Sequence, residues 1–293
     1  MSKRMCYEIA GHKIAIVYMD DHNDDTLLPS FERFRIPDTQ DTRLTVTVDD
    51  SFQMVRSSDE VGQFDCGGCN HGVYSLENGG YQFEVSDIHN ELCSCMQTNA
   101  DFSECIVSLQ HPSLNQRRYG MNNAMMISYA FRFATENTVL VHASVIRKNG
   151  YGYLMIAPSG TGKSTHTHLW FENIPECDLM NDDNPIVRFI DGELIVYGSP
   201  WSGKTPCYRN IQAPVGAFVR IKQHPENIIT RLDPISALAE LLPSMSSMKW
   251  DHRVYRAVSD TVINIIQTVG IYELKCLPDA AAAQLCYNTV KRA

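Results

Sequence analysis

The stretch Ala157–Ser164, APSGTGKS, combines small residues with hydroxyl side chains and one lysine. A small residue, four further residues and then Gly162-Lys163-Ser164 give the spacing of a phosphate-binding loop. Small side chains let backbone N–H groups converge on phosphate oxygens, and a helix that starts at Lys163 adds partial positive charge. The stretch therefore predicts a site for a chain of phosphates.

Side chains of this loop have separate expected tasks. Lys163 would place its charge on the β and γ phosphates, the Ser164 hydroxyl would hold Mg²⁺, and Thr165 can donate a further hydrogen bond. A glycine turn before an ordinary helix is the alternative, and it leaves Lys163 without a role. The predicted nucleotide-binding residues are Ser159, Gly160, Thr161, Gly162, Lys163, Ser164 and Thr165.

Two adjacent carboxylates follow in LMNDDNP, at Asp182 and Asp183. Phosphoryl transfer needs a carboxylate near the metal ion. Neighbouring strand residues point to opposite faces, but at a strand end both can reach one site. We expect Asp183 to bind Mg²⁺ together with Ser164, and the other carboxylate to take the proton of an attacking hydroxyl. A polar turn before Pro185 is the alternative.

Two further places carry candidate residues. His142, inside the apolar VLVHASVI, is either a hydrogen-bonded core histidine or a catalytic residue close to the phosphates. The segment Gly198–Asn210, GSPWSGKTPCYRN, has little strand or helix character, and loops of this kind often carry function. Within it Arg209, and equally Lys204, could stabilise charge on the transferring phosphate. Trp201 could wall a substrate, or it could only anchor a surface loop.

Positioning these residues requires several strands whose ends meet. VLVHASVI and YGYLMIA flank Asn149-Gly150, and NPIVRFI and ELIVYG flank Asp191-Gly192, so both pairs predict antiparallel hairpins. YGYLMIA runs directly into the glycine loop. Asp233 and Pro234 predict the start of a helix in DPISALAELLPSM. Two later helices are expected in DHRVYRAVSDTVINIIQTV and PDAAAAQLCYNTVKR, while His166 and His168 are expected on a packed or solvated helix face.

The first part of the chain reads as β-rich. HKIAIVYM and RLTVTVDD alternate as strands do, and GVYSLENGGYQFEVSD predicts two strands around Asn78–Gly80. The methionines and aromatic residues of NQRRYGMNNAMMISYAFRFATENT form a helical stripe, which is either core or a subunit contact in a homo-oligomer. We predict an α+β or mixed α/β protein with a β-rich region at residues 1–112 and a second domain at residues 113–293.

Composition excludes some classes of protein. A net charge of −9 over 293 residues disfavours nucleic acid as a partner. No apolar run is long enough for a bilayer, and Glu8, His12 and Lys13 break the N-terminal one, so we expect neither a membrane partner nor a signal peptide but a cytoplasmic protein. Reduced thiols are then expected for the ten cysteines. Cys66 and Cys69 have the spacing of a metal or redox pair, although their glycines fit a turn equally well.

The chain resembles the HPr kinase/phosphorylase-like kinases over about residues 135 to 290. The resemblance is carried by four features in combination: the VHAS strand, PSGTGKST, the DD pair and YGSPWSG…YRN. The resemblance implies the nucleotide-binding fold of phosphoenolpyruvate carboxykinase, with a more antiparallel sheet than that of most P-loop ATPases. It also implies ATP and Mg²⁺ as cofactors, phosphates on Gly160–Thr165, Asp182 and Asp183 as the acidic pair, and His142 beside them. The residues before 110 and GSPWSGKTPCYRN depart from that family's pattern.

The function predicted from these features is an ATP- and Mg²⁺-dependent kinase that moves the γ-phosphoryl group to a hydroxyl. Positioning and charge neutralisation would supply the catalysis. The acceptor stays open between a small metabolite and a serine of a protein or peptide, and the donor between ATP, GTP and pyrophosphate. Two alternatives are a carboxykinase-type lyase, which needs a transition metal with a lysine and a histidine, and a regulatory protein that binds nucleotide without turnover.

Overall fold

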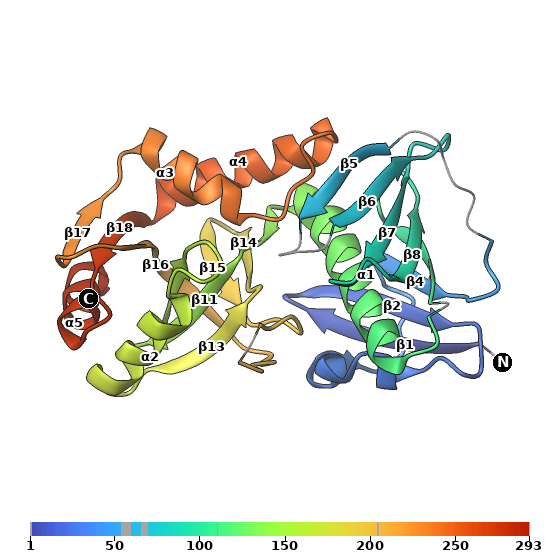
Figure 1. Cartoon of the computed structure of the whole chain (residues 1–293), viewed down its shortest axis with the longest axis horizontal. Helices are drawn as coiled ribbons and strands as arrows, with labels where there is room; N and C mark the ends of the chain where they lie inside the picture. The colour runs from blue at the N-terminus through green and yellow to red at the C-terminus, as the bar shows by residue number, and fades with distance from the viewer. Residues whose placement is uncertain (1, 54–59, 66–69, 110, 204, 293) are drawn as a thin grey trace. The chain divides into compact units, whose positions relative to one another are not determined.

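The computed structural model describes residues 2–53, 60–65, 70–109, 111–203 and 205–292. The chain divides into two compact units, Met1–Phe133 with Lys249–Asp251 and Ala134–Met248 with His252–Ala293. Within the described ranges each unit holds one nine-stranded sheet (Figure 1). Both sheets mix parallel and antiparallel neighbours, so the expectation of a mixed α/β protein is confirmed at that level.

The sheet of the first unit has the strand order β3-β1-β2-β4-β9-β8-β7-β6-β5. β2 pairs in parallel with β4 and β4 with β9, while the other neighbours are antiparallel. The two strands expected around Asn78–Gly80 are β6 and β7. The strands are β1 (Lys3–Ile9), β2 (His12–Tyr18), β3 (Arg35–Ile36), β4 (Leu44–Val48), β5 (Glu60–Asp65), β6 (Asn70–Ser75), β7 (Tyr81–Ser86), β8 (Leu92–Thr98) and β9 (Glu104–Ser108).

Helix α1 (Leu114–Phe133) belongs to this first unit. Met121, Met125, Tyr129 and Phe133 recur every fourth residue and are fully buried, so the predicted stripe lies in the unit's own core. The Tyr129 hydroxyl donates a hydrogen bond to the carbonyl of Ile9 in β1, at 2.9 Å. The division between the units therefore lies after Phe133 rather than after residue 112, because the helix buries its apolar face against the preceding strands.

The sheet of the second unit runs β10-β14-β15-β16-β12-β11-β13, with β18 beside β16 and β17 beside β18. β16 pairs in parallel with β12 and β18, and the other pairs are antiparallel. Its strands are β10 (Thr138–Leu140), β11 (Ala143–Lys148), β12 (Tyr151–Ile156), β13 (Asp178–Asp183), β14 (Ile186–Ile190), β15 (Glu193–Tyr197), β16 (Gln212–Gln223), β17 (Ile228–Arg231) and β18 (Gly270–Cys276).

Local turn chemistry explains the hairpins of this sheet. Asn149 and Gly150 have φ of 51° and 80°, and Asp191 and Gly192 have φ of 51° and 84°. Two consecutive positive φ angles match a two-residue hairpin turn, and they favour Asn-Gly and Asp-Gly. The β11–β12 and β14–β15 hairpins expected from these dipeptides are thus confirmed.

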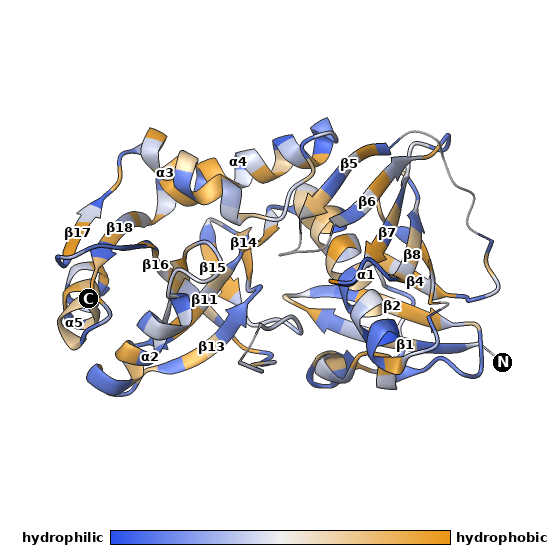
Figure 2. Cartoon of the chain, viewed as in Figure 1, coloured by the Kyte–Doolittle hydropathy of each residue, from blue (hydrophilic) through white to orange (hydrophobic). Residues whose placement is uncertain are grey.

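Four helices accompany the second sheet among the described residues: α2 (Lys163–Asn173), α3 (Pro234–Leu241), α4 (His252–Thr268) and α5 (Ala280–Val290). Asp233 caps α3 as expected, because its carboxylate accepts from the N–H groups of Ile235 and Ser236. Apolar and polar residues are interspersed along α4 in Figure 2, and its buried members include Val254, Val258, Val262 and Ile265. Among the residues described, no helix is both long enough and apolar enough to span a bilayer.

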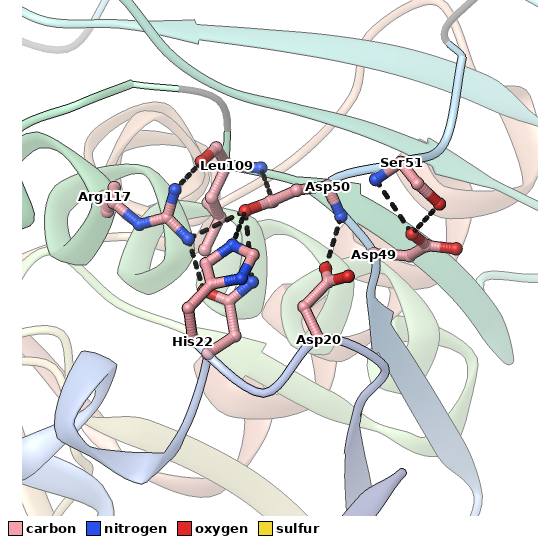
Figure 3. Close-up of polar contacts among 8 residues, drawn as sticks. Asp20, His22, Asp49, Asp50, Ser51, Leu109 and Arg117 are labelled. Atoms are coloured by element: carbon pink, nitrogen blue, oxygen red, sulfur yellow. Dashed lines mark hydrogen bonds and ion pairs between the residues drawn. The ribbon is translucent and has the colours of Figure 1, made fainter. Parts of the chain in front are cut away.

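A partly buried ion pair ties the first unit together (Figure 3). The Asp50 carboxylate follows β4 and accepts from the Arg117 guanidinium of α1 at 2.8 Å and from His22 at 2.9 Å. It also accepts from the amide of Asn23 at 3.1 Å and the backbone N–H of Leu109 at 2.6 Å. Arg117 donates further to the carbonyl of Leu109 and to Asn23. The pair thus joins α1 to the ends of β4 and β9.

Asp50 also lies in a cluster with Asp20 and His22, whose donor atoms are within 4.8 Å of one another. The Asp20 carboxylate accepts from the backbone N–H of Asp50 at 2.8 Å. The guanidinium of Arg117 occupies the position beside Asp50, and its charge would repel a cation there. The cluster is therefore best explained as a structural network.

We predict that Asp50→Asn destabilises the first unit by about 2 kcal/mol at neutral pH, because the partly buried Arg117 then lacks its counter-ion. Burial raises the pKa of Asp50, but the hydrogen bonds led by that of Arg117 outweigh it and hold the pKa below its ordinary value. The stabilisation is therefore present above about pH 4 and is lost as the pH falls through the folded-state pKa. Urea unfolding of both proteins at several pH values measures it.

The control is Asp41→Asn, since the Asp41 side chain is 75% exposed and its ion pair with Lys13 lies on the surface. We expect this change to cost less than about 1 kcal/mol. Equal stabilities of wild type and Asp50→Asn at neutral pH would contradict the structural role of the pair.

Candidate functional site

The start of β11 and the ends of β12 and β13 meet at one edge of the sheet of the second unit. Antiparallel pairing places Ala143, the first residue of β11, opposite both Ile156 at the end of β12 and Asp183 at the end of β13. His142 directly precedes β11, and the glycine loop directly follows β12. The register therefore brings His142, the loop and Asp183 together.

The glycine loop has two residues with positive φ angles. Gly160 and Gly162 have φ of +78° and +119°, and a Cβ added at either would meet nothing within 4 Å. Glycine is thus required by backbone conformation and not by lack of space. Gly162 is the N-cap of α2 and offers no side chain, so the first N–H groups of the helix are available to a ligand. Ser159, Gly160, Ser164 and Thr165 are exposed.

A line of three polar groups runs beside the loop. The Lys163 ammonium lies 2.9 Å from the carbonyl oxygen of Ala157 and 2.6 Å from His142 Nε2. His142 Nδ1 lies 3.3 Å from Asp183 Oδ1. An ammonium can only donate, so His142 accepts at Nε2 and carries its proton on Nδ1, toward the carboxylate. The three groups form a cation, a neutral imidazole and an anion in series.

Burial sets the titration of this line. Burial lowers the pKa of His142, and the positive charge of Lys163 lowers this pKa further. The carboxylates of Asp183 and Asp182 act in the opposite direction but do not outweigh these two effects. Burial also lowers the pKa of Lys163, although Asp183 and Asp182 oppose the change. Burial raises the pKa of Asp183 despite the nearby His142 and Lys163. The charged forms of Lys163 and Asp183 are therefore less stabilised here than they would be in water.

The two aspartates have different surroundings. Asp182 is only 6% exposed and accepts a hydrogen bond from the hydroxyl of Ser144, which lies opposite it on β11. Asp183, with its side chain 32% exposed, faces His142 and accepts from the amide of Asn184 at 2.8 Å. Successive strand residues point to opposite faces, which explains the difference. Ser144 could not be identified from the sequence, because only the strand register assigns it a partner.

Arg209 is not brought to the loop. Its guanidinium donates to Asp178 at 2.8 Å and to the carbonyl of Leu179 at 2.5 Å. Asp178 is the first residue of β13 and Asp183 the last, so Arg209 binds roughly 16 Å away along the strand. The expectation that it acts on the phosphates does not fit this placement, because the segment that carries it returns along β13 toward that strand's beginning.

A different arginine lies near the loop lysine. Arg220 stands opposite Ile156 in the parallel β12–β16 pair, and its positive charge contributes to lowering the pKa of Lys163. Its Nε lies 2.9 Å from a carboxylate oxygen of Glu240 on α3. In the sequence, the signal for Arg220 was a charged residue within the apolar strand APVGAFVRIKQ. No motif accompanies this arginine, so the sequence did not link it to the glycine loop.

The remaining candidates are placed as follows. His166 is buried and accepts from the Trp170 indole at 3.1 Å, and burial lowers its pKa to about 4. His168 is exposed beside Glu172, so both histidines lie on the packed or solvated face expected of them. Trp201 is buried beneath its loop. Lys204, Cys66 and Cys69 lie outside the described residues.

A cavity of about 720 Å³ opens beside the loop. This volume is within the range of small-molecule pockets, roughly 300 to 1,000 Å³. β12, β16 and β18 are parallel, so the segments after them meet at the same edge of the sheet. Gln223 links two of them, since its amide donates to the carbonyl of Thr161 at 3.1 Å. The residues that line the cavity include Gly160, Thr165, His166, Leu169, Ile221, His224, Cys276 and Leu277.

No family model matches this sequence, and no curated protein matches it either. Among solved structures, the chain is similar to the structure of the HPr(Ser) kinase/phosphatase from Coxiella burnetii. The two share 12% sequence identity with a TM-score of 0.31, over 52% of this chain and 87% of that chain. A TM-score this low does not establish a common fold, so the likeness is weak.

Proposed function

We propose that this chain is an ATP- and Mg²⁺-dependent phosphotransferase, similar in kind to the HPr kinase/phosphorylase-like kinases, with a small molecule or a serine of a protein or peptide as acceptor. The observation that carries the proposal is the convergence of Lys163, His142 and Asp183 beside an exposed glycine loop that opens a helix. A loop of this kind binds phosphates through backbone N–H groups, and phosphoryl transfer needs the cation and carboxylate that stand next to it.

Lys163 has a clear task in this proposal. Without ligand its ammonium is held by the carbonyl of Ala157 and by His142, which are both neutral acceptors. A phosphate oxygen carries negative charge and is a stronger acceptor, so the lysine would turn toward a bound phosphate chain. That movement also releases the lone pair of His142 Nε2.

Ser164 and Asp183 fit Mg²⁺, since a hydroxyl and a carboxylate are hard oxygen donors of the kind this ion prefers. Burial raises the pKa of Asp183, and a cation beside it would favour the charged carboxylate. When bound, Mg²⁺ would neutralise charge on the β and γ phosphates. The fit rests on donor chemistry, with Ser164 exposed on the first turn of α2.

His142 suits the role of proton acceptor. Its Nδ1 is occupied by the contact with Asp183, and Nε2 becomes free once Lys163 turns away. It would then take the proton of the acceptor hydroxyl, and the carboxylate would stabilise the resulting imidazolium. Asp182 is less suited to this task than the sequence suggested, because it is buried against Ser144.

The cavity beside the loop favours a nucleoside triphosphate over pyrophosphate as the donor. Its walls combine apolar side chains such as Leu169 and Leu277 with a few polar groups, and they border Gly160–Gly162. Such a lining suits a flat heterocyclic base. No observation favours the lyase alternative, since the cluster of possible metal ligands found in the described ranges is that of Asp50, in the other unit.

We predict that Lys163→Ala weakens Mg·ATP binding by about 10- to 100-fold, because one charge-assisted hydrogen bond to phosphate is lost. Asp183→Asn should instead leave ATP binding without metal within a few fold and lower turnover by about 100-fold or more. Binding is measured by calorimetry, and turnover by following γ-labelled phosphate from ATP into a panel of metabolites and peptides.

The control for this pair is Arg209→Lys, which changes a cation at the other end of β13. It should leave both binding and turnover unchanged. Full turnover in Asp183→Asn would contradict the kinase proposal, whereas unchanged nucleotide binding in both variants without any turnover in wild type would favour the regulatory alternative.

We further predict that Leu277→Trp weakens ATP binding about tenfold and leaves inorganic tripolyphosphate binding unchanged, because the larger side chain fills the cavity but not the loop. Leu277 is 40% exposed, so the change should not disturb the core. The control is Ile228→Trp, an equally exposed position of the same unit that does not line the cavity. Equal loss of both ligands would show that the cavity does not hold the nucleoside.

A further inference from the structure

Asp183 has an unusual backbone conformation. Its φ is +121°, a region that residues with a Cβ rarely adopt. Such strain persists only where the surrounding structure holds the residue firmly, and it is found most often at functional sites. The groups that hold Asp183 are therefore candidates for a role in placing its carboxylate.

The backbone carbonyls of the two residues next to Asp183 are bound by residues of the loop between Gly198 and Asn210. The carbonyl of Asp182 accepts from the N–H of Gly203 at 2.5 Å and lies 2.9 Å from the hydroxyl of Ser202. The carbonyl of Asn184 accepts from the hydroxyl of Ser199 at 2.6 Å. A Cβ at Gly203 would lie 3.1 Å from that of Asp183, so the loop backbone rests directly on the aspartate side chain.

The loop is itself held by a fully buried amide. Asn181 lies two residues before Asp183, so both side chains are on the same face of β13. Its Nδ2 lies 3.1 Å from the carbonyl oxygen of Trp201, 3.2 Å from the hydroxyl of Ser199 and 3.4 Å from the carbonyl oxygen of Cys207. Acceptors surround this atom, so an N–H donor is required there.

Asn181 and Ser199 thus form a buried link from β13 to the loop and back to the strand end. Both have no exposed surface. A buried polar pair whose donors are used in this way defines one arrangement of the chain, because any other would leave the same groups unpaired. The strained residue lies between the two points where this link meets the backbone.

We propose that Asn181 and Ser199 are positioning residues that hold Asp183 in its left-handed conformation and direct its carboxylate to His142. The inference rests on the proposed function for its catalytic consequence, but the conformational part is independent of it. Loss of the Ser199 hydroxyl would free the carbonyl of Asn184 and let Asp183 relax away from His142 Nδ1.

The first experiment separates turnover from binding. Ser199→Ala should lower kcat about tenfold or more while the Kd for ATP measured without Mg²⁺ stays within about twofold, because the glycine loop is unaltered. Ser202→Ala, at a half-buried position, is the second variant, and Ser202→Thr should restore kcat because it keeps the hydroxyl. Ser259→Ala is the control, since it removes a serine hydroxyl bound to a carbonyl on α4. An unchanged kcat in the folded Ser199→Ala and Ser202→Ala variants would overturn the proposal.

The second experiment needs no activity. Asp183→Gly should raise Tm by about 2–4 °C in the wild-type background, because glycine adopts the positive φ without strain. In the Ser199→Ala background the same change should raise Tm by less than half as much, since Asp183 has already relaxed. Equal shifts in both backgrounds would overturn the positioning role. Absence of turnover in wild type with unequal shifts would instead overturn only the proposed function.

Discussion

The candidate site depends on one feature of strand pairing, the alignment of Ala143 with both Ile156 and Asp183. Two antiparallel neighbours of β11 therefore end at the point where β11 begins. Three segments distant in sequence supply an imidazole, an ammonium and a carboxylate at that edge, and each side chain is fixed by a strand or helix rather than by a long loop. A shift of β13 by one residue against β11 would turn Asp182 to the other face, away from Ser144, and would separate His142 from Asp183.

Features governed by neighbouring residues could be predicted from the sequence. The turns at Asn149-Gly150 and Asp191-Gly192, the Asp233 cap and the glycines of the phosphate loop each depend on the φ angles or hydrogen bonds of a few adjacent residues. The apolar stripe of α1 was equally clear. Its burial partner was not, because period and hydrophobicity show that a face is buried and do not show which sheet buries it.

Features that depend on long-range pairing could not be predicted in the same way. Arg209 and Arg220 are both arginines near loop or strand ends, and only the paths of β13 and β16 place one far from Lys163 and the other beside it. The roles of Ser144, Asn181 and Ser199 likewise arise from contacts across strands or with the returning loop. Asp182 and Asp183 were identified together, but their separation into a buried and a facing carboxylate required the register.

A comparison of two partly buried carboxylates supports the location of function in the second unit. Asp50 accepts hydrogen bonds from a guanidinium, an imidazole, an amide and a backbone N–H, and its pKa is lowered. Asp183 has the neutral His142 and Asn184 as partners, and its pKa is raised by burial. A carboxylate that serves only stability is expected to have its charge compensated by the fold. One that is strained, incompletely compensated and near a partly buried lysine is expected where a ligand supplies the missing charge.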